Sequence, residues 1–185
     1  MNKKYYTTVL ISILTIVAFS LVSFIESPEE EEQANQVKWM TLDEVVEAQK
    51  ESPKPVIVNL FTTWCVWCSK MDESTFNDPG LISYINENFH ALKFDAEADI
   101  NVSLNGQEFP LITINNRKVH KLAWEWGAVN NRIGYPTIVV LDEKMNKLQA
   151  FPGFKDVEAM RVLARYFVED VYKSKSWQEY LSSGN

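Results

Sequence analysis

The sequence is poor in several residue types, and each shortage excludes a class of protein. Two cysteines and two histidines among 185 residues exclude a disulfide-stapled scaffold and leave a Cys/His zinc site poorly supplied. Six glycines and seven prolines exclude collagen-like and low-complexity chains. Lys and Arg number 18 against 25 Asp and Glu, with no basic run in the body of the chain, which argues against nucleic-acid binding. What remains is an acidic globular domain with an additional segment at its N-terminus.

That N-terminal segment lacks charge from Val9 to Ile25, and Lys3 and Lys4 precede it. At about 1.5 Å per residue, a helix over this run would span roughly 25 Å, less than the roughly 30 Å of a bilayer core. A basic start followed by an apolar run is typical of an export signal. We therefore predict that residues 1–25 are a signal peptide or an N-terminal membrane anchor, and that the rest of the chain is exported. Contact with a membrane would come only through residues 9–25, if they are retained.

An acidic run follows, with five glutamates within residues 26–33. Such a run repels itself and cannot bury apolar surface, so residues 26–36 are interpreted as a solvated linker. The folded domain is expected to cover residues 37–185.

Hydrophobic periodicity and capping signals predict an α/β domain. Thr41 and Glu44 fit a capping box, and Asn115-Asn116 fits the turn of a hairpin. Helices are expected at 41–50, 65–76, 81–88, 121–126 and 156–171. Strands are expected at 56–61, 90–95, 109–114, 117–120, 137–141 and 147–151. Helices that alternate with strands predict a central mixed sheet flanked by helices.

Both cysteines fall in one CxxC motif, Trp64-Cys65-Val66-Trp67-Cys68, between a predicted buried strand and a predicted helix. Unpaired backbone N–H groups and the positive end of the helix dipole stabilise a thiolate at a helix N-terminus. A second cysteine three residues later can attack a mixed disulfide formed by the first. The motif therefore favours redox chemistry.

Other interpretations of the dithiol compete with redox chemistry. A structural disulfide would close a loop too short to add much stability, and two inert buried thiols would leave the export signal unexplained. A copper-binding or haem-maturation protein could hold a metal with the same dithiol, although Met71 is the only further ligand nearby. A non-catalytic interaction module with a vestigial dithiol is a third possibility.

Several segments together resemble the thioredoxin superfamily. They are Phe61-Thr-Thr-Trp-Cys-Val-Trp-Cys-Ser-Lys-Met71, Ile133-Gly-Tyr-Pro-Thr137 before a strand, and Gly153 ahead of the last long helix. The continuation from Cys68 to Pro79 is similar to exported bacterial thioredoxin-like proteins, including the C-terminal domain of the periplasmic transmembrane disulfide reductase. The resemblance covers about residues 39–171.

The resemblance implies a thioredoxin-like fold and a thiol–disulfide oxidoreductase that reduces or exchanges disulfides in exported proteins. Cys65 would be the nucleophile and Cys68 the resolving thiol. Pro136 would be a cis-proline beside them, Tyr135 would present a backbone edge to an extended substrate, and Trp64 and Trp67 would form an apolar contact surface. No metal or organic cofactor is expected. Partners would be disulfide-containing client proteins and a membrane or periplasmic thiol redox partner, in the bacterial periplasm or at the outer face of the inner membrane.

Three departures from thioredoxin itself affect these expectations. Asn59 occupies the position of a buried aspartate, so proton transfer from Cys68 would need water or another group, for which Asp95 and Glu97 are candidates. The residues between the cysteines, Val66 and Trp67, carry no charge, which predicts a potential toward the reducing end of a family range of roughly −270 to −120 mV. The segment near 100–130 is longer than a minimal thioredoxin needs, and it is expected to form a hairpin and a helix beside the site. Trp124 and Trp126 are assigned to the core.

Overall fold

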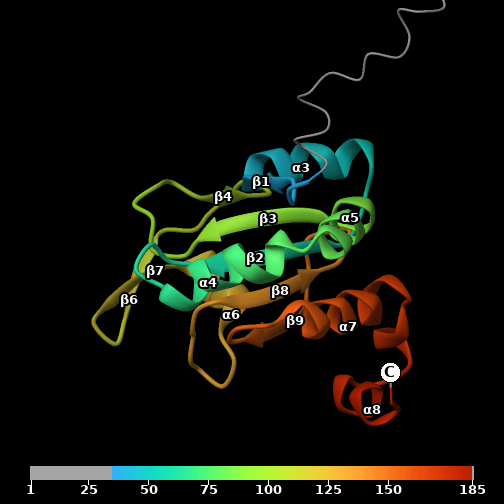
Figure 1. Cartoon of the computed structure of the whole chain (residues 1–185). Helices are drawn as coiled ribbons and strands as arrows, with labels where there is room; N and C mark the ends of the chain where they lie inside the picture. The colour runs from blue at the N-terminus through green and yellow to red at the C-terminus, as the bar shows by residue number, and fades with distance from the viewer. Residues whose placement is uncertain (1–34, 185) are drawn as a thin grey trace, which may run out of the picture. The chain divides into compact units, whose positions relative to one another are not determined.

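A five-stranded mixed sheet organises the computed structural model, which describes residues 35–184 (Figure 1). The predicted signal or anchor and most of the acidic linker lie outside the described residues. The strand order is β1-β3-β2-β8-β9, with β1, β2 and β3 mutually parallel and β8 and β9 antiparallel to their neighbours. These strands are β1 Trp39–Met40, β2 Val56–Phe61, β3 His90–Asp95, β8 Thr137–Leu141 and β9 Lys147–Pro152.

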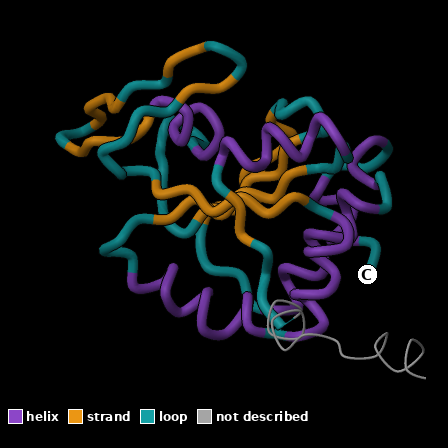
Figure 2. Tube along the Cα trace, turned by 90° about the horizontal axis from the view of Figure 1, so that it is seen from above, coloured by secondary structure: helices purple, strands orange, loops and turns teal. Residues whose placement is uncertain are grey.

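Helices cover both sides of this sheet (Figure 2). They are α3 Leu42–Glu51, α4 Val66–Ser74, α5 Pro79–Asn88, α6 Lys121–Gly127, α7 Val157–Val168 and α8 Trp177–Ser182. Two short 3₁₀ turns, η2 Thr75–Asn77 and η3 Val171–Lys173, follow α4 and α7. The predicted α/β fold with a mixed sheet flanked by helices is confirmed. None of the helices within residues 35–184 combines the length and the apolar character required to cross a membrane.

The alternation of side chains along β2 divides the core into two clusters. Ile57 packs on one side with residues of α4, α5 and α7, among them Met71 and Leu163. Val58 and Leu60 pack on the other side with residues of α3 and α6. Because β2 is the central strand and is buried on both faces, its position is fixed, and so is the position of whatever follows its carboxyl end.

The segment between β3 and β8 contains two small hairpins and α6. Strands β4 Ser103–Leu104 and β5 Gln107–Glu108 pair with each other, as do β6 Leu111–Ile114 and β7 Arg117–His120. Asn115 and Asn116 join β6 to β7 with φ of 49° and 64°, the positive values that a tight two-residue hairpin turn requires and that asparagine tolerates. The expected hairpin and helix near 100–130 are therefore present, and β4–β5 is an additional hairpin.

The C-terminal region differs from the prediction. The apolar pattern predicts one helix to Val171, but α7 ends at Val168 and Asp170 adopts a φ of 56°. Helix α8 was not predicted. It is held by ring contacts, because Trp177 lies 5.0 Å from Phe151 and 5.1 Å from Tyr166 between ring centroids.

Asp78 connects α5 to α7 and makes the stability of the fold depend on pH. Its carboxylate accepts a hydrogen bond from the Leu81 backbone N–H at 2.8 Å, and Arg161 donates to it at 2.7 Å. The Leu81 N–H, with a smaller contribution from Arg161, lowers the pKa of Asp78 below its usual value.

A depressed folded-state pKa contributes stability above the unfolded pKa of about 3.9, and this contribution is lost as the pH falls through the folded pKa. The Asp78→Asn variant keeps a capping oxygen but removes the charge. It should therefore unfold at lower urea concentration than the wild type at pH 7. The difference should disappear at the acid end of a series of urea titrations. A difference independent of pH would contradict this assignment.

Candidate functional site

The CxxC motif occupies the junction between β2 and α4. Cys65 is the N-cap of α4 in an extended conformation, and its backbone N–H donates to the Thr62 carbonyl at 3.1 Å. Cys68 lies in the first turn of the helix. Their position follows from the two elements on either side. The buried strand β2 ends at Phe61 and helix α4 begins at Val66, so the motif lies at the point where the chain passes from one to the other.

The two cysteines are joined by a disulfide, with Cα atoms 5.3 Å apart. Cys65 and Cys68 expose only 5% and 3% of their surface. The Cys68 backbone N–H donates to the Cys65 sulfur at 3.1 Å. In the reduced protein, the same N–H and the positive end of the helix would stabilise a thiolate on Cys65.

The loop before β8 lies beside the motif. The Tyr135–Pro136 peptide bond is cis, and the Pro136 carbonyl accepts a hydrogen bond from the Gly153 N–H at 2.8 Å. The antiparallel pairing of Leu60 with Thr137 places the start of β8 next to the end of β2. The rings of Trp64 and Tyr135 meet edge to face at 5.9 Å, so this loop and the CxxC motif form one continuous surface.

Two tryptophans beside the cysteines are half exposed, Trp64 at 54% and Trp67 at 55%. Trp67 contacts Phe154 at 5.7 Å between ring centroids, and the Lys70 ammonium lies 5.0 Å from its ring. Exposed rings of this size offer apolar area to a second molecule.

Trp64 also contacts two charged side chains. Its indole N–H donates to the Glu97 carboxylate at 2.8 Å, and the Arg117 guanidinium lies 5.4 Å from its ring. Glu97 is one of the two residues that the sequence offered as proton acceptors for Cys68, and it is hydrogen-bonded to Trp64. The other candidate, Asp95, accepts a hydrogen bond from the Glu97 backbone N–H at 3.0 Å.

Asn59 lies two residues before the end of β2 and is almost completely buried, with 1% of its surface exposed. Its side-chain oxygen has no hydrogen-bond partner among the described residues. Lys93 is opposite Asn59 in the register of β2 and β3, and the Lys93 ammonium forms an ion pair with Asp72 of α4 at 2.7 Å. The sequence did not point to Asp72, which lies four positions after Cys68 and so on the same face of α4.

An unsatisfied buried oxygen costs free energy, so replacing Asn59 with valine should stabilise the fold. We expect the Asn59→Val variant to raise the free energy of unfolding by about 1 kcal/mol, because valine fills the site and suits a central strand. Urea titration of the oxidised protein measures the change. The Asn59→Ala variant removes the same amide but leaves a void, and it should show no gain. Destabilisation by Asn59→Val would contradict this account.

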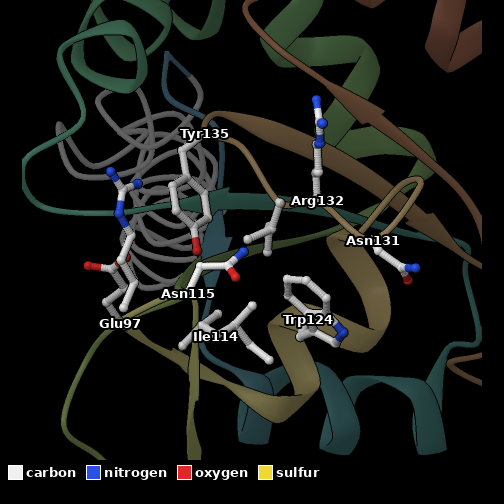
Figure 3. Close-up of a pocket in the computed structure, with 10 residues that line it drawn as sticks. Glu97, Ile114, Asn115, Trp124, Asn131, Arg132 and Tyr135 are labelled. Carbon is white, nitrogen blue, oxygen red and sulfur yellow. The ribbon is translucent and has the colours of Figure 1, made fainter.

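A pocket of about 400 Å³ opens next to Tyr135, between the β6–β7 hairpin, α6 and the loop before β8 (Figure 3). Its walls include Arg117 and Trp124, together with Glu97, Ile114, Asn115, Val119, Asn131, Arg132, Ile133 and Tyr135. Trp126 is buried, as expected of a core residue, whereas Trp124 is only partly buried and lines the pocket. Sequence patterns could not locate this pocket, because its walls come from separate segments.

Burial, reinforced by the negative charges of Glu97 and Asp95, raises the pKa of Tyr135 well above its usual value. The phenol is therefore protonated throughout the physiological pH range. Its hydroxyl oxygen is buried and has no hydrogen-bond partner among residues 35–184. Figure 3 shows the Tyr135 ring directed toward Asn115 in the pocket wall.

The described residues show no group of three or more His, Cys, Asp or Glu side chains arranged to hold a metal ion. Met71, the further copper ligand that the sequence offered, is fully buried among core residues. His120 is also buried, and its ring nitrogens face the carbonyls of Ala98 and Phe109 at 2.7 and 3.4 Å.

Comparisons with known proteins agree with this geometry. The family model Thioredox_DsbH, described as "Protein of unknown function, DUF255", matches residues 26–114. A comparison with curated proteins gives no match. A putative disulphide-isomerase from Bacteroides thetaiotaomicron is similar at 21% identity and a TM-score of 0.52, over 77% of this chain and 98% of that one. A thioredoxin from Thermus thermophilus is similar at 17% identity and a TM-score of 0.51, over 71% and 87%.

The C-terminal domain of DsbD from Neisseria meningitidis, in the oxidised form, is similar at 21% identity over 72% of this chain and 91% of that one, with a TM-score of 0.42. At these identities, the two structures with TM-scores above 0.5 show the fold alone. The thioredoxin-like fold expected from the sequence is thereby confirmed, with a CxxC disulfide at the start of the first helix after β2.

Proposed function

We propose that the protein is a thiol–disulfide oxidoreductase that reduces or exchanges disulfides in exported client proteins. The observation that carries the proposal is the Cys65–Cys68 pair at the N-terminus of α4, where the Cys68 N–H already donates to the Cys65 sulfur. A thiolate at this position is stabilised before any substrate arrives. Cys68 lies inside the first turn of α4, a position that suits a thiol that reacts with its neighbour Cys65.

In the reducing direction, the Cys65 thiolate attacks one sulfur of a client disulfide, and the other client sulfur leaves as a thiolate that takes up a proton. The Cys68 thiol then loses its proton and attacks the Cys65 sulfur of the mixed disulfide. This second step releases the client's second thiolate and forms the Cys65–Cys68 disulfide present in the structure. Two electrons pass to the client, and a dithiol protein must return them before the next cycle.

The surface around the cysteines supports the expected roles of its neighbours. Trp64, directly before Cys65, and Trp67, between the two cysteines, are half exposed and offer apolar area. Tyr135 and Pro136 would present backbone groups to an extended client segment. No organic cofactor or metal takes part in this scheme.

The proposed location is the exported side of a membrane, in the bacterial periplasm or at the outer face of the inner membrane. The support is the basic start and uncharged run of residues 1–25, which we propose as signal or anchor, followed by a linker to residue 36 and the domain from residue 37. In that setting the electron donor would be a membrane or periplasmic thiol redox partner.

The proposal is tested by equilibrating the full chain with a thiol–disulfide couple over a range of potentials. Thiol alkylation then counts reduced cysteines, and copper and zinc binding is measured on the same sample. We expect a reversible two-electron transition near the reducing end of the family range, at about −270 mV. Stoichiometric copper binding without a reversible disulfide would overturn the proposal and favour the metal-binding alternative.

A further inference from the structure

We propose that the pocket between the β6–β7 hairpin, α6 and the loop before β8 binds an acidic segment of the client, next to the disulfide that is attacked. We call it the hairpin pocket; its residues were given above, and a smaller hollow lined by Trp64, Glu97, Arg117 and Lys118 adjoins it. As a statement about the substrate, the inference rests on the proposed function. The binding of an acidic peptide can be tested without it.

The hairpin pocket and the dithiol share one surface. Arg117 and Glu97 line both the pocket and the smaller hollow. Trp64, adjacent to Cys65 in sequence, forms part of the hollow, and its ring contacts Tyr135 of the pocket wall. A chain bound near the cysteines can therefore continue into the pocket.

The charge around the pocket is opposite to that of the protein. Arg117, Lys118 and Arg132 line the pocket and the hollow, where Glu97 is the one lining carboxylate, whereas the whole chain carries a net charge of −7. Asp95 lies close enough for its negative charge to act on Tyr135 of the pocket wall. No ion pair within residues 35–184 neutralises any of these three cations. Glu97 is already occupied by the indole N–H of Trp64. Three cations against these two carboxylates leave an excess of positive charge around the pocket, which favours a ligand with carboxylates.

The walls of the pocket are held in place by two turns of the same kind. Asn115-Asn116 joins β6 to β7, and Asn130-Asn131 has φ of 51° and 56° between Val129 and Arg132, which form a bridge. Backbone hydrogen bonds of 2.9 and 3.1 Å close the second turn. Because the pairing fixes the backbone, little entropy is lost when a ligand binds between the turns.

The remaining groups suit a peptide better than a compact ion. Trp124, Ile114 and Ile133 supply apolar lining, and Asn115 and Asn131 supply polar lining. The buried hydroxyl of Tyr135, which has no hydrogen-bond partner among the described residues, could donate to a carboxylate that enters. A volume of about 400 Å³ accommodates one or two side chains of an extended segment.

The test uses the full chain, oxidised, and two cysteine-free extended peptides that differ only in having glutamates or lysines. Binding is followed by the indole N–H resonance of Trp124, assigned with a Trp124→Phe variant. We expect the glutamate peptide to bind roughly tenfold more tightly at low salt, and to weaken at about 0.3 M salt because exposed charges are then screened. Equal affinity for the two peptides would overturn the inference.

Two substitutions of Arg117 test whether the preference for the glutamate peptide arises at the pocket. Arg117→Gln should reduce the preference roughly threefold, and Arg117→Glu should reverse it. The matched control is Arg165→Gln, which removes the same charge from an exposed position on α7 and should leave the preference unchanged. A preference that falls equally in the control would mean that only net charge matters, and the pocket would be rejected.

The chain's own glutamates at 29–32 could compete for the pocket, so the titration is repeated with these four changed to glutamine. Tighter peptide binding in that variant supports a pocket for acidic segments. The same peptides with a disulfide added measure exchange separately. Peptide binding without exchange would reject the proposed function and keep the binding site. Exchange without a preference for the glutamate peptide would keep the proposed function and reject the binding site.

Discussion

Replacing Cys68 with serine is expected to stop the exchange at a mixed disulfide between Cys65 and the client. A serine hydroxyl stays protonated near neutral pH and cannot displace the client thiolate, so the first step proceeds and the second does not. Turnover should fall by roughly 10³-fold or more. Incubation with a disulfide-bonded substrate, followed by electrophoresis without reductant, would show the covalent complex.

The Cys65→Ser variant provides the contrast. It should lose turnover to the same extent but form no complex, because the thiol that remains, Cys68, lies within α4 and lacks the hydrogen bond from the helix N-terminus that the Cys65 sulfur accepts. The double variant controls for other reactions of the substrate. If Cys65→Ser formed the complex and Cys68→Ser did not, the roles of nucleophile and resolving thiol would be exchanged.

Replacing Leu60 with alanine should cost about 2–5 kcal/mol of unfolding free energy. Leu60 is fully buried in β2 and packs with the cluster beneath α6. Its truncation leaves a cavity between the central strand and the helix that borders the hairpin pocket. Denaturant unfolding of the oxidised protein measures the loss, and a change below about 1 kcal/mol would show that the site collapses or is filled.

Gly127 provides a second test of the packing around Leu60. A Cβ at Gly127 would overlap the Leu60 Cδ1 methyl group and would lie 3.2 Å from Ile133 Cδ1. Gly127→Ala alone should therefore destabilise the protein by about 1–3 kcal/mol, through overpacking. In the Leu60→Ala background, the added methyl group enters the space left by Leu60, and the same substitution should cost much less. Additive effects of the two substitutions would contradict direct contact between them.

The central strands could be predicted from sequence almost to the residue. Strands 56–61, 90–95 and 137–141 have the expected bounds. The first and the last are nearly continuous apolar, β-branched runs, which have few alternative conformations. The capping box of Thr41 and Glu44 is also confirmed, with the two reciprocal contacts at 2.7 and 3.4 Å. These elements depend on local sequence signals.

The elements that were missed depend on tertiary contacts. Strand β1 has two residues, too few for a pattern, and pairs with β3 through Trp39 and Met40. Helix α8 has six residues and is held by rings from β9 and α7. The apolar residues after Val168 continue the helical pattern, but Asp170 in the left-handed region interrupts the helix.

The candidate site divides in the same way. Cys65 and Cys68 could be identified because the motif is contiguous and sits between a strand and a helix. Arg117 and Trp124 could not, since they are distant in sequence from the motif and only the packing of the hairpin and α6 brings them near Trp64 and Tyr135. The bond between Glu97 and Trp64 likewise joins residues 33 positions apart.

The antiparallel pairing of β2 with β8 has a consequence for how such proteins can diversify. Leu60 pairs with Thr137 and Phe61 pairs with Asp95. The chain therefore leaves β3 and enters β8 at the same end of the sheet, next to the carboxyl end of β2 where α4 follows. Residues inserted between these points never have to cross the sheet (Figure 1). Changes of length or sequence in this segment leave the strand order unchanged, and the added residues lie near the dithiol. Under the proposed function, partner choice would therefore vary in this segment while the dithiol and the sheet stay the same.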